Sequence, residues 1–338
     1  MDKAELKRFA HDLGIDLVGV TTRARLDACL PAADRPSRIS EYLDTVLVLG
    51  KHIHAGAAGA QDGIHKQFAG AILHRSLEDA TAELAYHVEG AGHIAAVIPS
   101  LFLDFRDRNP EDNCPAGQGS RFLRLAGVEA GLGTLGLNLM LLTPQFGPRV
   151  ILTGMMADLA LEPDPPLPQE LCPGLEGCGR CAAICPEDAI PRAAPVGAPL
   201  AAVRALDGKA CARSSQPHGV GAYVEHMRKI LAAKGPDERL ELVRSPETAR
   251  IWQNMAVLRH GAFTGCMACM EVCPVGEDYA LVQRSPHRQA DLLGGVQRGL
   301  ADGRVLVAWA PRARPIAVAA GPGAGGRGPV RVRPTSDP

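Results

Sequence analysis

Apolar residues recur along the first 160 residues with two different spacings. Residues 2–13 and 71–89 show helical spacing, and each stretch ends at a glycine, which commonly stops a helix. Residues 45–49 are a continuous apolar run before Gly50, which predicts a buried strand. The remaining runs predict strands at 15–20, 92–98, 139–143 and 149–153 and a helix at 119–131. Because strands and helices mix throughout this half, we predict an α/β domain.

A proline-rich stretch divides the chain. Residues 162–168 contain four prolines in seven positions, which is typical of a domain boundary. We therefore predict an α/β domain for cofactor and substrate over residues 1–162 and a cysteine-rich domain over residues 169–290. Residues 303–338 are rich in Pro, Gly, Arg and Ala, which predicts a disordered tail.

Six cysteines form two runs of the same shape, C-x2-C-x3-C-P. The first run holds Cys178, Cys181 and Cys185, and the second begins at Cys266 and ends at Cys273 with Cys269 between them. This spacing is the tail of the bacterial ferredoxin pattern, in which the cysteine before proline ligates the other cluster. Two copies predict an α+β ferredoxin-like domain with a pair of [4Fe–4S] clusters and one-electron chemistry.

Each run lacks one cysteine of the full ferredoxin pattern. Cys172 lies six residues upstream of the first run, and Cys211 is the cysteine left between the two runs. We therefore predict two ligand sets of four thiolates each. One set is Cys172, Cys178, Cys181 and Cys273, and the other is Cys185, Cys211, Cys266 and Cys269. A single structural zinc held by the two C-x2-C pairs is an alternative that leaves four cysteines unexplained.

Composition and charge narrow the functional classes. Aromatic residues make up 4% of the chain and the net charge is −1, with 36 basic and 37 acidic residues, which argues against a nucleic-acid ligand. No apolar run reaches the roughly 18–20 residues of a membrane helix, and the N-terminal helix pattern differs from that of a signal peptide. We expect a cytoplasmic location without membrane contact, where thiols stay reduced and disulfides are disfavoured.

Residues 131–136 satisfy the spacing G-x-G-x-x-G, which in dinucleotide-binding proteins follows a strand and opens a helix. Here the predicted helix precedes the glycines and the predicted strand follows them. This inverted order argues against a dinucleotide. The glycines serve either a tight helix-to-strand turn or close approach of the backbone to a ligand.

Three stretches together resemble the epoxyqueuosine reductase and reductive dehalogenase superfamily. They are residues 130–136, residues 141–149 and the N-terminal residues 13–19. The resemblance implies a nitroreductase-like α/β domain, a dicluster ferredoxin domain and a cobalamin held between the two. It makes Gly131, Gly133, Gly136 and Asn138 candidate cofactor-binding residues.

The chain departs from epoxyqueuosine reductase in ways that bear on its substrate. Leu137 stands where that enzyme typically has lysine, and the region around Cys114 lacks its Asp-Ser-Ala-Pro element. The C-terminal helical repeats that grip tRNA in longer members have no counterpart, so tRNA is a poor substrate guess. Candidate proton donors are Asp104, Asp112 and Cys114, followed by Asp107 and His65, whereas Cys29 is interpreted as structural.

Two functional hypotheses follow. The first is an iron–sulfur reductase that takes single electrons from a donor such as ferredoxin or flavodoxin. It passes them through two clusters to cobalamin and reduces a small organic substrate. The alternative is an electron-transfer protein or a reductive activator of a separate corrinoid protein.

Overall fold

The structure is a computed structural model, and its described residues are 2–60, 63–100, 118–216, 218–254, 266–284, 296–297 and 306–307. The predicted disordered tail, residues 303–338, therefore lies outside the described residues except for Leu306–Val307.

A four-stranded antiparallel sheet forms the centre of the N-terminal half. Its order is β1 (Leu17–Thr22), β2 (Thr45–His52), β6 (Val150–Ala157) and β3 (Ala95–Ile98). Neighbouring side chains of β2 point to opposite faces, and both faces are apolar, so the strand reads as an unbroken hydrophobic run. The sequence predicted this burial, but the pairing of β6 between β2 and β3 comes from contacts remote in the chain.

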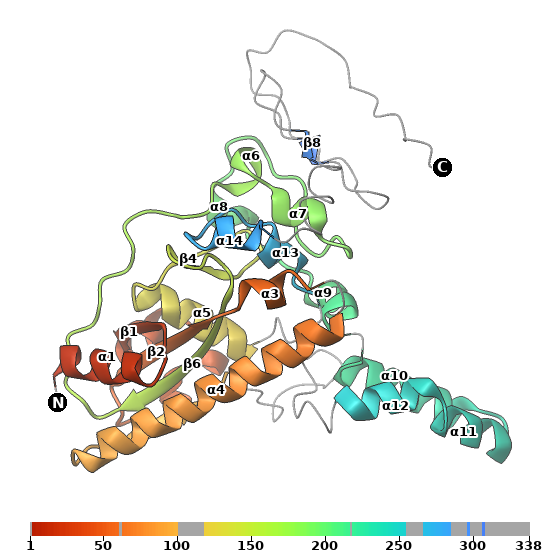
Figure 1. Cartoon of the computed structure of the whole chain (residues 1–338), viewed down its shortest axis with the longest axis horizontal. Helices are drawn as coiled ribbons and strands as arrows, with labels where there is room; N and C mark the ends of the chain where they lie inside the picture. Colours follow the sequence, from red (N-terminus) through yellow and green to blue (C-terminus); the bar gives the residue numbers. More distant parts are fainter. Residues whose placement is uncertain are drawn as a thin grey trace, which may run out of the picture.

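Helices cover both faces of the sheet, as Figure 1 shows for the long α4 running beneath it. On one face, α1 (Lys3–Asp12) and α4 (Gly63–Gly90) pack on Leu47, Leu49 and Met155. On the other face, α2 (Arg23–Cys29) and α5 (Gln118–Glu129) pack on the alternate residues of the same strands. The result is a three-layer mixed α/β arrangement, which confirms the predicted class.

The predicted elements differ from the structure mainly at their ends. Helix α4 begins at Gly63, eight residues before the predicted start, because its first turns pack on the cysteine-rich half through Lys66 and Glu271. The predicted strand at 139–143 is a two-residue strand, β5 (Leu141–Leu142), which pairs with β4 (Thr134–Leu135). The glycine motif is therefore part of a small hairpin that follows helix α5.

The other elements have at most eight residues each, except α10 with 13. They are η1 (Ala32–Asp34), η2 (Pro36–Arg38), α3 (Ala55–Ala58), α6 (Gly174–Gly177), α7 (Arg180–Ile184), α8 (Leu200–Val203), α9 (Gly208–Ser215), α10 (Val220–Ala232), α11 (Pro236–Val243), α12 (Pro246–Trp252), α13 (Ala268–Glu271), α14 (Tyr279–Val282), β7 (Val296–Gln297) and β8 (Leu306–Val307).

The proline-rich linker is held against the N-terminal domain. Asp164 accepts hydrogen bonds from Lys7 (2.7 Å), Lys3 (3.0 Å) and the backbone N–H of Val20 (2.9 Å). Burial alone would raise the pKa of Asp164, but these bonds outweigh it and hold that pKa below its ordinary value. The linker thus serves as a strap that crosses α1 and β1.

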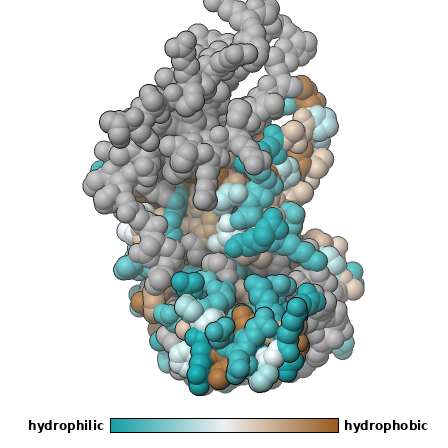
Figure 2. All heavy atoms as spheres, turned by 90° about the vertical axis from the view of Figure 1, so that its right-hand side faces the viewer, coloured by the Kyte–Doolittle hydropathy of each residue, from teal (hydrophilic) through white to brown (hydrophobic). Residues whose placement is uncertain are grey.

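Helices α10, α11 and α12 form an arm that projects from the body between Cys211 and Cys266 (Figure 1). The lower part of Figure 2, which views the molecule from that side, is mostly hydrophilic with isolated apolar residues. None of the helices within the described ranges combines the length and the apolar character needed to cross a membrane.

Candidate functional site

Four cysteines line one small cavity beside the glycine hairpin, and we call Cys172, Cys178, Cys181 and Cys273 the first cysteine group. Tight turns bring the first three together, because Gly174 and Gly179 have positive φ angles of 74° and 61° that favour glycine. Cys273 comes from the second cysteine run, 101 residues downstream of Cys172. The cysteine that precedes proline thus lies with the opposite run.

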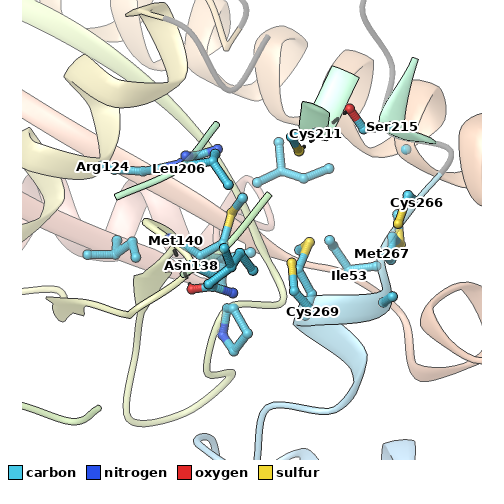
Figure 3. Close-up of a pocket in the computed structure, with 18 of the residues that line it drawn as sticks. Ile53, Arg124, Asn138, Met140, Leu206, Cys211, Ser215, Cys266, Met267 and Cys269 are labelled. Atoms are coloured by element: carbon cyan, nitrogen blue, oxygen red, sulfur yellow. Dashed lines mark hydrogen bonds between the residues drawn. The ribbon is translucent and has the colours of Figure 1, made fainter. Parts of the chain in front are cut away.

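The other four cysteines line a larger cavity of about 160 Å³, and we call Cys185, Cys211, Cys266 and Cys269 the second cysteine group. Figure 3 shows Cys211 on one side of this cavity, with Cys266 and Cys269 facing it from other sides. The N–H of Ala189 donates to the Cys185 sulfur at 3.3 Å. Cys211 is held on α9, which is capped by Asp207 through the N–H of Ala210.

The sulfurs within each group interact electrostatically. Burial raises the pKa of Cys181 to about 12, and the neighbouring Cys172, Cys178 and Cys273 add to the rise. Burial also raises the pKa of Cys266, with contributions from Cys211 and Cys185. Buried thiols this close together are costly to ionise, and a cationic cluster is the kind of partner that removes this cost by replacing the protons.

The two groups coincide with the two ligand sets expected from the sequence, and ligation itself stays a prediction. Among the described residues, no three or more histidine, cysteine or carboxylate side chains converge tightly enough to hold one metal ion. A cubane cluster has a different requirement, because four irons at separate corners each take one thiolate. The nine described cysteines are free thiols, which leaves both groups available for this chemistry.

Both halves of the chain contribute to the wall of the larger cavity. Ile53, Met140 and Leu206 give it an apolar lining, and Arg124 and Asn138 are polar groups at its edge (Figure 3). Arg124 donates to the backbone oxygen of Leu139 at 3.0 Å. The cavity therefore combines an apolar interior with a few fixed polar groups, which is the usual composition of a site for a small organic molecule.

A hydrogen-bonded series reaches the same cavity from α4 and the end of β3. The Ser100 hydroxyl donates to Glu78 Oε1 at 2.5 Å, and Ser100 Oγ lies 2.7 Å from His74 Nδ1. Because the single hydroxyl hydrogen of Ser100 is directed at Glu78, His74 donates through Nδ1–H to Ser100 in this arrangement. His74 and Ser100 both line the cavity. The sequence reasoning missed this series because its members lie on one helix and beyond the end of the next strand, with no motif that links them.

The glycines of the G-x-G-x-x-G motif lie against the backbone of this chain. A Cβ at Gly131 would lie 2.3 Å from the backbone oxygen of Pro165, and a Cβ at Gly133 would lie 2.0 Å from that of Leu142. Gly136 and Asn138 line the smaller cavity beside the first cysteine group. Packing alone thus explains the first two glycines, and contact of any of these residues with a cofactor stays a prediction.

Arg149 ties the two halves together. Its side chain is fully buried, donates to both carboxylate oxygens of Asp278, and donates to the backbone oxygens of Met270, Cys273 and Val275. These acceptors surround the end of the second cysteine run. The sequence motif included Arg149, but spacing alone gave no reason to assign it a role.

Two of the remaining candidates are described by the structure, and four are not. Asp104, Asp107, Asp112 and Cys114 lie outside the described residues. His65 is exposed on α4, and Cys29 is exposed at the end of α2.

The comparisons with known proteins point to reductases. No protein-family model matches the chain. The tetrachloroethene reductive dehalogenase of Sulfurospirillum multivorans is 41% identical over 63 residues, which are 19% of this chain and 13% of that protein. An epoxyqueuosine reductase from Streptococcus thermophilus has a TM-score of 0.47 and 15% identity, over 81% of this chain and 65% of that one. A catabolic reductive dehalogenase has a TM-score of 0.46 and 20% identity, over 76% of this chain and 36% of that one.

The chain thus spans less than two thirds of the length of each of these proteins. The resemblance predicted from the sequence motifs is confirmed to the extent of this sequence match, in which 63 residues are similar to part of a reductive dehalogenase. The substrates of those proteins are not assigned to this chain. Its function is inferred from its own residues.

Proposed function

We propose that this chain is an iron–sulfur reductase in which the two cysteine groups each hold a [4Fe–4S] cluster. The observation that carries the proposal is the sorting of eight cysteines into two groups of four, each lining its own cavity. Four thiolates are the complete ligand set of such a cluster. Clusters of this kind would supply one-electron transfer.

The position of the two groups gives the electron path a direction. The second cysteine group lines the larger cavity, and the first lines a separate cavity with Arg180 and Val275 at its wall. Electrons from an external donor such as ferredoxin or flavodoxin would enter at the first group and leave through the second. The acceptor is then a small, largely apolar organic molecule in the larger cavity.

His74 is the described residue best arranged to supply a proton to that acceptor. Its ring is oriented by the hydrogen bond between Nδ1 and Ser100, and the residue lines the larger cavity. The Glu78 carboxylate accepts the Ser100 hydroxyl at the other end of the series and so fixes the orientation of that hydroxyl.

Cobalamin is the cofactor that the resemblance implies. The described cavity of about 160 Å³ is below the roughly 300–1,000 Å³ of pockets for drug-sized ligands, and a corrin ring is larger still. Binding would require the cavity to widen, so no step proposed for His74 depends on cobalamin. This size favours the second candidate function, a reductive activator that passes electrons to a corrinoid carried by another protein.

Anaerobic purification with metal and sulfide analysis tests the proposal. We expect about eight iron and eight sulfide per chain and a broad visible absorption that dithionite bleaches. Zinc without sulfide would contradict the cluster assignment. Titration of the reconstituted protein with hydroxocobalamin then tests the cofactor that the resemblance implies, because saturable binding supports a cobalamin-dependent reductase and its absence removes cobalamin from this chain.

A further inference from the structure

Arg149 and Asp278 form a buried pair at the end of the second cysteine run. Arg149 has no exposed side-chain surface, and the Asp278 side chain is 16% exposed. Arg149 donates to the backbone oxygen of Cys273 at 3.0 Å and to that of Val275 at 2.7 Å. A full positive charge is therefore fixed beside the backbone of one member of the first cysteine group.

The pair has a defined electrostatic polarity. Both of the donors directed at Met270 and Cys273 come from one terminal nitrogen, Nη1, whereas Asp278 takes its bonds from Nε and Nη2. The guanidinium is thus directed at the Cys273 carbonyl, with the carboxylate on its other edge. The arginine also lowers the pKa of Cys273 against the larger raising effect of burial.

We propose that Arg149 and Asp278 set the reduction potential of the first cluster, with Arg149 raising it and Asp278 lowering it. This inference rests on the proposed cluster at Cys172, Cys178, Cys181 and Cys273. Reduction adds one electron to the cluster without breaking a bond, so a nearby positive charge stabilises the reduced form and a negative charge destabilises it. Arg149 is a positioning residue in this scheme, since it acts through Cys273 and its loop.

A purely structural role predicts a different pattern. If Arg149 only joined the two halves, removing either partner would loosen the same loop and move the potential in the same direction. Tuning by charge predicts that the two substitutions move the potential in opposite directions. Arg149→Gln leaves the negative Asp278 carboxylate without its positive partner, and Asp278→Asn leaves the positive Arg149 guanidinium without its negative partner. The two substitutions therefore separate charge from structure.

The experiment is a dithionite titration of the full-length, cluster-loaded protein, monitored by electron paramagnetic resonance. Relative to wild type, we expect Arg149→Gln to lower one of two potentials and Asp278→Asn to raise it. Each shift should be about tenfold in the reduction equilibrium constant, which is ~59 mV for a one-electron couple. Arg149→Lys should keep the potential near wild type, because it keeps the charge.

A matched control is the exposed ion pair of Arg23 and Asp44, where Arg23→Gln and Asp44→Asn should move neither potential. Should Arg149→Gln fail to fold, Asp278→Asn still tests the charge effect by raising the potential, and Arg149→Lys still tests it by leaving the potential near wild type. Unchanged potentials, or shifts of both variants in one direction, would overturn the inference while leaving the proposed function standing. A wild-type protein that takes up no iron and sulfide would instead overturn the proposed function.

Discussion

Gly147 permits a backbone-to-backbone contact between the two halves of the chain. It lies in the left-handed region with φ of 53°, and a Cβ at this position would lie 1.9 Å from the backbone oxygen of Val275. Real Cβ atoms essentially never come closer than 3.0 Å, so Gly147→Ala requires the loop after Cys273 to retreat by more than 1 Å.

The expected cost of Gly147→Ala has two parts. An alanine in the left-handed region costs about 1–2 kcal/mol, and overpacking a tight contact costs about 1–3 kcal/mol more. We therefore expect the free energy of unfolding to fall by about 2–5 kcal/mol. Because the displaced loop carries Cys273, iron incorporation at the first cysteine group should fall as well.

Gly197→Ala is the matched control. Gly197 also has a positive φ, 74°, but nothing lies within 4 Å of its Cβ position. It should lose only the conformational part, about 1–2 kcal/mol, and keep its iron. The measurement is anaerobic guanidinium denaturation followed by circular dichroism, with iron content determined on the same samples. Equal destabilisation by the two substitutions would refute the close contact between Gly147 and Val275.

Three further predictions concern separate parts of the molecule. Cys211→Ala should reduce iron from about eight to about four per chain, whereas Cys29→Ala should leave it unchanged; full iron in the first variant would mean a different ligand. Asp164→Asn should lower stability by about 1–3 kcal/mol at neutral pH. The pKa of Asp164 is lowered in the folded state, so the stability difference between wild type and Asp164→Asn should be complete at pH values above 3.8, the ordinary pKa of the group. The difference should vanish as the pH falls through the folded-state pKa, which denaturation at a series of pH values would show. On any compound that the wild type reduces with reduced methyl viologen, His74→Gln should slow turnover by about 100-fold or more at unchanged iron content; an unchanged rate would exclude His74 as the proton donor.

The sequence predicted the elements whose burial is local and periodic. Helix α1 ends before Gly14 as expected, and β2 begins at Thr45, the first residue of the predicted strand. The order of the strands could not be predicted from the sequence. The position of β6 between β2 and β3 depends on pairing between strands that are more than fifty residues apart in the chain. Cysteine spacing is a different kind of signal, and the cysteines that it grouped line two cavities, four in each.

There is a physical reason why the polar parts of the site could not be predicted from the sequence. Ser100 and His74 are ordinary residues in sequence, and they acquire a possible role only when β3 ends beside α4. Arg149 likewise becomes distinctive through its full burial among carbonyl oxygens of a segment more than 120 residues downstream. Such contacts depend on tertiary packing and have no short-range pattern.

The exchange of cysteines between the two runs has a consequence for how the protein is made. The first group needs Cys273 and the second needs Cys266 and Cys269, so both groups stay incomplete until the last part of the cysteine-rich half has been synthesised. If each group takes one cluster, a chain still emerging from the ribosome can finish neither of them. Cluster insertion would then be a late event in biogenesis, and a chain cut short before residue 266 would carry cysteines but no complete electron path.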